Sequence, residues 1–119
     1  MLLLSPSVAS AHNFSGTWAF SGTIGHENIE TMSGVCTLTQ DGDAIVGSCK
    51  GPDGVSVADG SVDGRKIVLR VHHVATGEGG VKGIALFKGV LGDDGIIRGE
   101  WTDSPRPDLT GPFTGQQVK

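Results

Sequence analysis

The sequence is poor in aromatic and charged residues. Among 119 residues there are two Trp, four Phe and no Tyr, and only 18% of the residues are charged. Acidic residues outnumber basic ones, and the net charge of -4 argues against nucleic-acid binding, which usually requires a basic face. The composition also excludes a membrane-spanning helix and a disordered chain. The length allows one small domain.

Helical periodicity is missing as well. No segment repeats apolar residues at i, i+3, i+4 and i+7, and alternating runs are instead separated by Gly and Asp. Such short strands with turn signals between them predict an all-β protein. We expect an eight-stranded antiparallel up-and-down barrel, with a flattened β-sandwich as the alternative. The predicted strands are 13–22, 27–40, 43–50, 54–62, 65–75, 81–92, 95–103 and 109–118.

The alternation predicts which side chains face the interior. In the first strand, Phe14, Trp18 and Phe20 share one face, while Ser15 and Ser21 share the other. Glycines between the large inward residues would relieve crowding and let a strongly coiled sheet close. The predicted inward set is Phe14, Trp18, Phe20, Leu38, Ile45, Ile67, Leu69, Val71, Phe87, Leu91, Ile97, Trp101 and Phe113.

Turn signals set the register of individual hairpins. Residues 62–65 are interpreted as a hairpin with the two-residue loop 63–64, which aligns Ile67 with Gly60. The sequence 92–96 is interpreted as a three-residue loop in which Gly95 is left-handed. The second register places Phe87 opposite Trp101 and Lys88 opposite Glu100, an attractive cross-strand charge pair.

The two cysteines fall into register in the same way. A hairpin that turns at the Asp-Gly signal near residue 42, with Gln40 opposite Ile45, places Cys36 directly opposite Cys49. Directly opposite residues lie within reach of a disulfide. We therefore predict a Cys36–Cys49 disulfide, with two buried free thiols as the alternative.

The first residues are typical of an export signal. A short apolar run precedes Ala9-Ser10-Ala11, a small-x-small pattern of the kind that signal peptidase cleaves. We interpret 1–11 as a signal-peptide remnant, or otherwise a disordered arm, and 12–119 as one barrel domain. Together with the predicted disulfide, this indicates a periplasmic or secreted protein.

The stretch Asn13-Phe14-Ser15-Gly16-Thr17-Trp18 resembles the Gly-x-Trp first strand of the calycins, the lipocalins and fatty-acid-binding proteins. The resemblance implies an antiparallel barrel in which the Trp closes one end of a ligand cavity. The lipocalin Thr-Asp-Tyr motif and C-terminal helix have no counterpart, and neither does the helical lid of fatty-acid-binding proteins. The chain also resembles small exported bacterial proteins with a second Gly-x-Trp near the end, here Gly99-Glu100-Trp101. Bacterial metalloprotease inhibitors with a small lipocalin-like barrel are a fainter likeness.

The longer connections gather at one end of the predicted barrel, near 22–27, 50–54, 76–80 and 103–109. Loop-rich ends are where ligand sites collect on such scaffolds. Aromatic side chains there would form walls for an apolar ligand, or they would simply fill the interior. The candidate ligand-binding residues are Trp18, Phe20, Val71, His73, Phe87 and Trp101.

His73 and Glu30 are the candidate acid–base residues. Alternation from Val71 turns His73 inward, opposite Gly83, whereas His72 points away and cannot chelate a metal together with it. His73 would act as a general base, or would instead cap the core with a hydrogen bond to a loop carbonyl. Glu30 faces inward if the alternation from Leu38 is unbroken, and outward if Gly34 marks a bulge, which we favour.

Three functions remain open. The first is binding of a small apolar or aromatic molecule at the loop-rich end. The second is a cofactor-free lyase, isomerase or cyclase that uses His73, with or without Glu30. The third is a protein-binding barrel, such as an inhibitor of a secreted protease. No pattern indicates a metal or cofactor, because the Asp-Gly turns lack the alternating oxygen ligands of a calcium loop.

Overall fold

The computed structural model describes residues 12–23, 31–51, 54–74, 82–104 and 110–118. Within these ranges the chain is built from strands and turns, without a helix. The eight strands are β1 (Gly16–Thr23), β2 (Thr31–Asp41), β3 (Ala44–Gly51), β4 (Gly54–Asp63), β5 (Lys66–Val74), β6 (Lys82–Leu91), β7 (Ile96–Ser104) and β8 (Thr110–Gln117).

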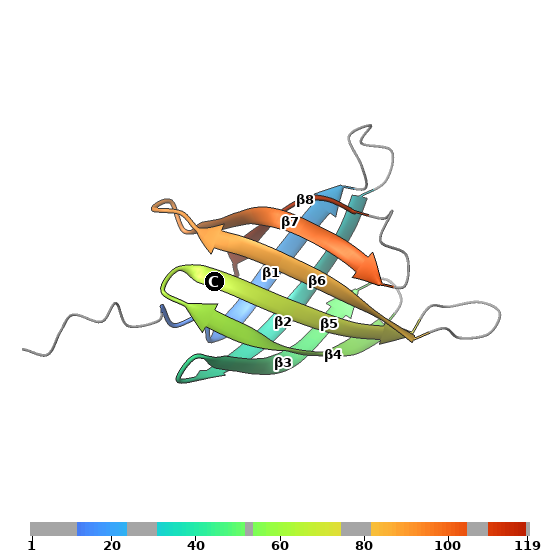
Figure 1. The fold of residues 1–119 in the computed structure, drawn as a ribbon, viewed down its shortest axis with the longest axis horizontal. Coiled ribbons are helices and arrows are strands. Elements are labelled where there is room, and N and C mark those ends of the chain that lie inside the picture. The colour runs from blue at the N-terminus through green and yellow to red at the C-terminus, as the bar shows by residue number, and fades with distance from the viewer. Residues whose placement is uncertain (1–11, 24–30, 52–53, 75–81, 105–109, 119) are drawn as a thin grey trace, which may run out of the picture.

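The sheet closes on itself. Each strand pairs antiparallel with the next one along the chain, and β1 pairs with β8. The result is the up-and-down barrel shown in Figure 1, and the flattened sandwich is excluded. Closure leaves no strand with an unpaired edge.

The barrel has two different ends. At the turn end, short turns join β2 to β3, β4 to β5 and β6 to β7. At the loop end, β1, β5 and β7 finish and the longer connections begin (Figure 1). β3 also finishes there, but Gly51 pairs with Gly54 and only residues 52–53 join it to β4, so the longer connection predicted near 50–54 is wrong. The two ends are referred to by these names below.

Residues 12–15 cross the turn end before the first strand starts. The His12 amide donates to the Gly64 carbonyl, and the Phe14 amide donates to the Gln40 side chain at 2.7 Å. The chain then bends at Gly16, whose φ of 129° is accessible to glycine. The predicted start of this strand at residue 13 was therefore three residues too early, because the preceding segment plugs the barrel instead of extending its wall.

Two of the predicted hairpin registers are confirmed. Gln40 pairs with Ile45, so Cys36 lies opposite Cys49 and the two form a disulfide. Phe87 pairs with Trp101 across a loop in which Gly95 has a φ of 82°.

The register of the β4–β5 hairpin differs from the prediction by two residues. Asp63 pairs with Lys66 and Gly60 pairs with Leu69, so the loop consists of Gly64 and Arg65. The first position of this loop takes a left-handed conformation, and Gly64, with a φ of 62°, supplies it. The same geometry occurs at Gly42, where φ is 66°. Because a shift of two residues preserves the alternation, the inward faces are unchanged.

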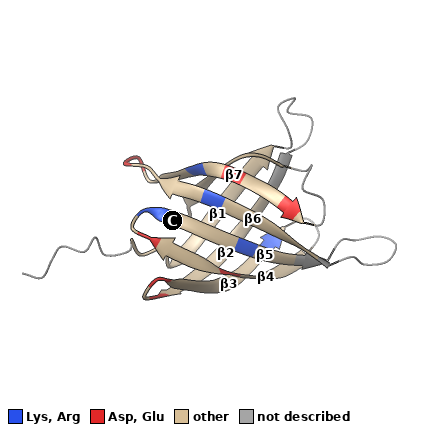
Figure 2. Ribbon diagram, viewed as in Figure 1, with Lys and Arg blue, Asp and Glu red and all other residues tan. Residues whose placement is uncertain are grey.

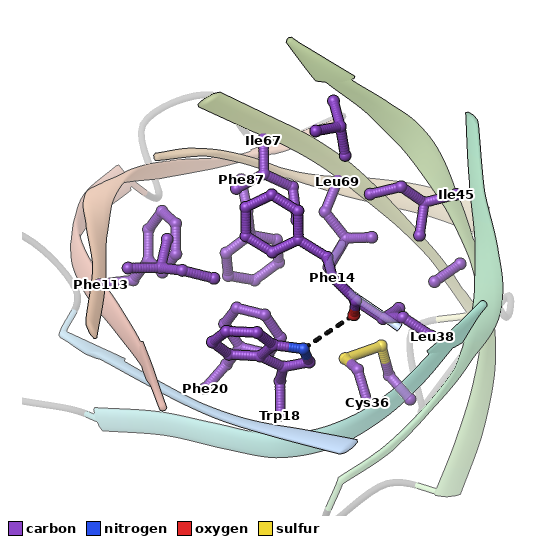
Figure 3. Close-up of a cluster of buried hydrophobic side chains, with 14 of the residues drawn as sticks. Phe14, Trp18, Phe20, Cys36, Leu38, Ile45, Ile67, Leu69, Phe87 and Phe113 are labelled. Carbon is purple, nitrogen blue, oxygen red and sulfur yellow. Dashed lines mark hydrogen bonds between the residues drawn. A yellow bond between two sulfur atoms is a disulfide. The ribbon is translucent and has the colours of Figure 1, made fainter. Parts of the chain in front are cut away.

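The barrel is filled by a single apolar core. Every predicted inward residue belongs to it, although Val71 is only partly buried and packs against its edge. The prediction omitted Ala58 and Val62, which are 1% and 3% exposed, and did not foresee that the disulfide lies in the core. Phe14 projects from its crossing segment into the middle of the barrel, above Trp18 (Figure 3).

The described residues include no helix that is long and apolar enough to cross a membrane. The predicted signal-peptide remnant lies outside the described residues, and that interpretation remains a prediction.

Candidate functional site

On β4, β5 and β6, inward-facing residues at the loop end are less buried than those nearer the turn end. Ser56 on β4, Val71 on β5 and Ala85 on β6 alternate with outward residues, yet each keeps part of its surface exposed to solvent. Near the turn end, Ile45 and Leu69 are each 1% exposed.

Small residues account for this difference. Among the described side chains from β2 to β6, the inward positions of the loop end are taken by Gly, Ala and Ser, with one Val and the disulfide, and all but the cystine are partly exposed. Side chains of this size cannot meet across the lumen of an eight-stranded barrel, which is wide enough to need large residues to fill it. The residues concerned are Gly34, Gly51, Ser56, Val71, Gly83 and Ala85. Met32 and His73 belong to the same inward alternation, and their side chains lie outside the described part of the structure.

An aromatic cluster bounds the other side of this space. Phe87 stacks on Trp101 with ring centroids 6.4 Å apart, and its edge meets Phe113 at 5.1 Å. Phe20 lies 6.0 Å from both Phe87 and Phe113. Packed aromatic pairs of this kind form a rigid apolar wall. Binding of a flat apolar molecule against this wall would cost little side-chain entropy, because the rings are already fixed.

Both tryptophans have their polar group occupied by the protein. The Trp18 indole donates to the Phe14 carbonyl at 2.9 Å, as Figure 3 shows, and the Trp101 indole donates to the Thr23 carbonyl at 3.0 Å. Neither N–H is available to a ligand without breaking a buried hydrogen bond. Trp18 is part of the packed turn end, whereas Trp101 borders the partly exposed positions of the loop end.

The six predicted ligand-binding residues therefore occupy different positions. Phe20, Val71, Phe87 and Trp101 surround the loop end, and their predicted role is still a prediction. Trp18 lies in the opposite half beneath Phe14, which is 0% exposed and separates it from the turn-end solvent. The backbone of His73 pairs with Gly83, as the sequence predicted. The side chain of His73 lies outside the described part of the structure, so its predicted chemistry also stays a prediction.

Glu30 lies outside the described residues. The predicted orientation of Glu30 depended on whether β2 is regular. The pairing of β1 with β2 runs without interruption from Gly16↔Leu38 to Thr23↔Thr31. The bulge that we favoured at Gly34 is therefore wrong, since Gly34 pairs regularly with Phe20. Its missing side chain relieves crowding against the neighbouring backbone, where a Cβ would lie 3.3 Å from the Lys50 carbonyl oxygen.

Asp103 is an ionisable group of this region that the sequence interpretation overlooked. It pairs with Ala85, follows the inward alternation of Ile97 and Trp101, and is only 9% exposed. The alternation was itself sufficient to find it, because a polar residue two positions after an inward Trp must face the same way. The inner wall at the loop end thus carries a carboxylate beside its apolar residues.

His72 faces outward, as predicted. Its Nε2 lies 2.6 Å from one carboxylate oxygen of Asp59, and the Arg70 Nε donates to the other at 2.8 Å. The hydrogen bond from Arg70 is the main cause that lowers the pKa of Asp59 below its ordinary value, with His72 contributing less. No group of three or more His, Cys, Asp or Glu side chains that would hold a metal occurs among the described residues.

No known family model matches the sequence, and no curated protein is detectably similar to it. The functional interpretation consequently depends on the geometry of the barrel.

Proposed function

We propose that the protein is an exported, calycin-like barrel that binds a small apolar or aromatic molecule inside its loop end. The observation that carries the proposal is the partial exposure of Ser56, Val71 and Ala85, three residues that face inward. Partly exposed inner positions beside an aromatic wall match the usual make-up of small-molecule sites, which are concave and mostly apolar.

The disulfide supports the exported location. Cys36 and Cys49 are both buried and joined, and the described residues contain no free cysteine. Stable structural disulfides belong to oxidising compartments such as the periplasm or the extracellular space. The eight-stranded architecture and the Gly-x-Trp start of β1 support the calycin likeness.

Binding of N-phenyl-1-naphthylamine, a neutral aromatic probe, tests the proposal. The expected result is saturable probe fluorescence excited through Trp101, with Kd raised at least tenfold in Ala85→Leu, because the larger side chain occupies the partly exposed inner space. Val57→Leu, at an outward position of β4 that is 66% exposed and lies outside the groove over β5, β6 and β7 described below, is the control and should keep the wild-type Kd. Absence of saturable binding, or equal binding by both variants, would contradict the proposal and favour the protein-binding alternative.

Asp103 supports a second candidate function, that of a cofactor-free acid–base enzyme. Its carboxylate belongs to the inner wall, and His73 lies on the same end of the barrel, with β6 between their two strands. A carboxylate and an imidazole are suited to proton transfer when they share an apolar site. An enzyme should lose turnover of a bound compound in His73→Ala and Asp103→Asn, whereas a binding protein should keep most of its affinity in His73→Ala.

A further inference from the structure

A groove runs along the outside of the barrel, away from the proposed lumen site. It has a volume of about 640 Å³ and lies over β5, β6 and β7. Its lining combines three basic side chains and several apolar ones with one carboxylate, that of Glu100, on a chain whose net charge is -4. The basic and apolar side chains of the groove include Lys66, Val68, Leu86, Lys88, Val90 and Arg98.

Charge is distributed unevenly over the molecule. In Figure 2 the basic residues gather on the outer face of β5, β6 and β7, whereas most acidic residues lie at the tips of the turns. Arg98 is neutralised, because Asp94 accepts its hydrogen bonds at 2.7 and 3.2 Å. Lys66 and Lys88 form no ion pair with any described residue, although Glu100 lies opposite Lys88 in the register.

The register brings these two free ammonium groups together. Lys66 pairs with Val90, and Lys88 lies two positions before Val90 on the same face of β6. The two lysines are therefore diagonal neighbours, with Cα atoms about 7–8 Å apart. Flexible lysine stems of this length allow both ammonium groups to reach one anionic head group.

The other two residues of these cross-strand pairs, Val68 and Val90, are apolar and form the second diagonal. Val68 pairs with Lys88, and Val90 and Leu86 flank Lys88 along β6. Val90 is 50% exposed, and Val68 and Leu86 are partly exposed. A hydrocarbon chain laid over these residues would remove apolar surface from water while its head group stays between the lysines.

We propose that this outer groove binds an amphipathic anion, a small molecule with one carboxylate head and an aliphatic chain. Two unpaired lysines suit one such head group, whereas a polyanion would need a more extended basic surface. The groove volume lies within the range of small-molecule sites. The proposal is independent of the lumen site, because every residue used here faces away from the barrel interior.

The test is an NMR titration of the full chain with decanoate at concentrations below the critical micelle concentration of decanoate. Binding is monitored through the amide chemical shifts of the protein. We expect saturable shifts concentrated on outer positions of β5, β6 and β7, and weaker binding of decan-1-ol and of decyltrimethylammonium. Lys66→Gln and Lys88→Gln should each raise the Kd about three- to fivefold, the size expected of an exposed charge pair. Lys50→Gln, an exposed lysine on β3 outside the groove, should leave the Kd unchanged.

Several results would overturn the proposal. One such result is equally tight binding of decan-1-ol and decanoate in the groove. Another is wild-type affinity for decanoate in both lysine variants. Either result would show that the lysines do not contribute to binding of the carboxylate. Shifts confined to Val71, Ala85 and Trp101 would assign decanoate to the lumen instead. Chemical shifts of the groove residues that change with protein concentration, and not with decanoate concentration, would show that this face mediates self-association. Ala85→Leu separates this proposal from the lumen site, because it should weaken naphthylamine binding and leave decanoate binding intact.

Discussion

The two halves of the barrel interior are built on the same strands but stabilised differently. The turn end is closed by residues 12–15 and filled by Phe14, Trp18 and Ile97, which are at most 2% exposed. The loop end has small, partly exposed inward residues, and the disulfide lies where the two halves meet, with Cys36 paired to Trp18. The comparison shows that tight packing is concentrated in one half of the barrel, whereas inward positions on β4, β5 and β6 in the other half stay partly exposed.

The largest effect should come from emptying the packed half. We expect Trp18→Ala to lower the free energy of unfolding by about 3–5 kcal/mol, because it leaves a cavity and removes the partner of the Phe14 carbonyl. Val71→Ala at the loop end should cost only about 1 kcal/mol, because Val71 is already partly exposed. Urea unfolding of both variants measures the difference, and similar losses would contradict the division into two halves.

Removal of the disulfide should have the next largest effect. Replacing both Cys36 and Cys49 with Ala is expected to lower the free energy of unfolding by about 3 kcal/mol, mainly through the greater freedom of the unfolded chain. Chemical denaturation of the variant beside the oxidised and reduced wild type provides the measurement. A loss well below 1 kcal/mol would show that packing alone holds the loop end together.

Enlargement of matched alanines compares the free space of the two regions directly. Ala58 is 1% exposed within the core, whereas Ala85 is partly exposed at the loop end, and both face inward. We expect Ala58→Leu to cost about 1–3 kcal/mol through overpacking and Ala85→Leu to stay within about 0.5 kcal/mol of wild type. Thermal and urea unfolding check this, and a loss in Ala85→Leu as large as that in Ala58→Leu would mean that the loop end is also filled.

The smallest effect concerns the charged turn between β6 and β7. Hydrogen bonds from Arg98, and then the Ile96 amide, lower the pKa of Asp94 from 3.8 to about 2. Because the pKa is depressed in the folded state, Asp94 stabilises the protein above about pH 4 and loses this contribution as the pH falls toward 2. Asp94→Asn should therefore weaken the pH dependence of unfolding between pH 4 and pH 2. Arg98→Gln should give a similar change, and an unaltered profile in both variants would contradict the assignment.

The alternation of side chains made the fold and most of the core predictable. A strand has a strict period of two, so the inward face follows from a few large residues such as Trp18 and Phe87 even when a register is off by two. The Asp-Gly turns and the cysteine spacing were local signals too, and they predicted the disulfide. The β4–β5 register failed because both Asp63 and Gly64 are acceptable turn residues, and only the need for a left-handed first loop position distinguishes them.

The candidate site was predictable only in part. The sequence indicated an apolar end with Val71, Phe87 and Trp101, but an inward position does not reveal whether a side chain meets another across the lumen. It also could not show that residues 12–15 plug the opposite end, because that contact joins His12 to Gly64 and Phe14 to Gln40 across long sequence separations. The outer groove was likewise hidden, since its lysines are spread over two strands.

The sequence by itself therefore determined the strand pattern, the inward faces and the Cys36–Cys49 pairing, because each depends on a period of two and on local turns. Only the tertiary structure excluded the sandwich, showed which end residues 12–15 plug and which end keeps partly exposed inward residues, and made Lys66 and Lys88 neighbours. These features depend on where strands distant in sequence meet and on the volume left between their side chains, and neither quantity is a property of any single segment.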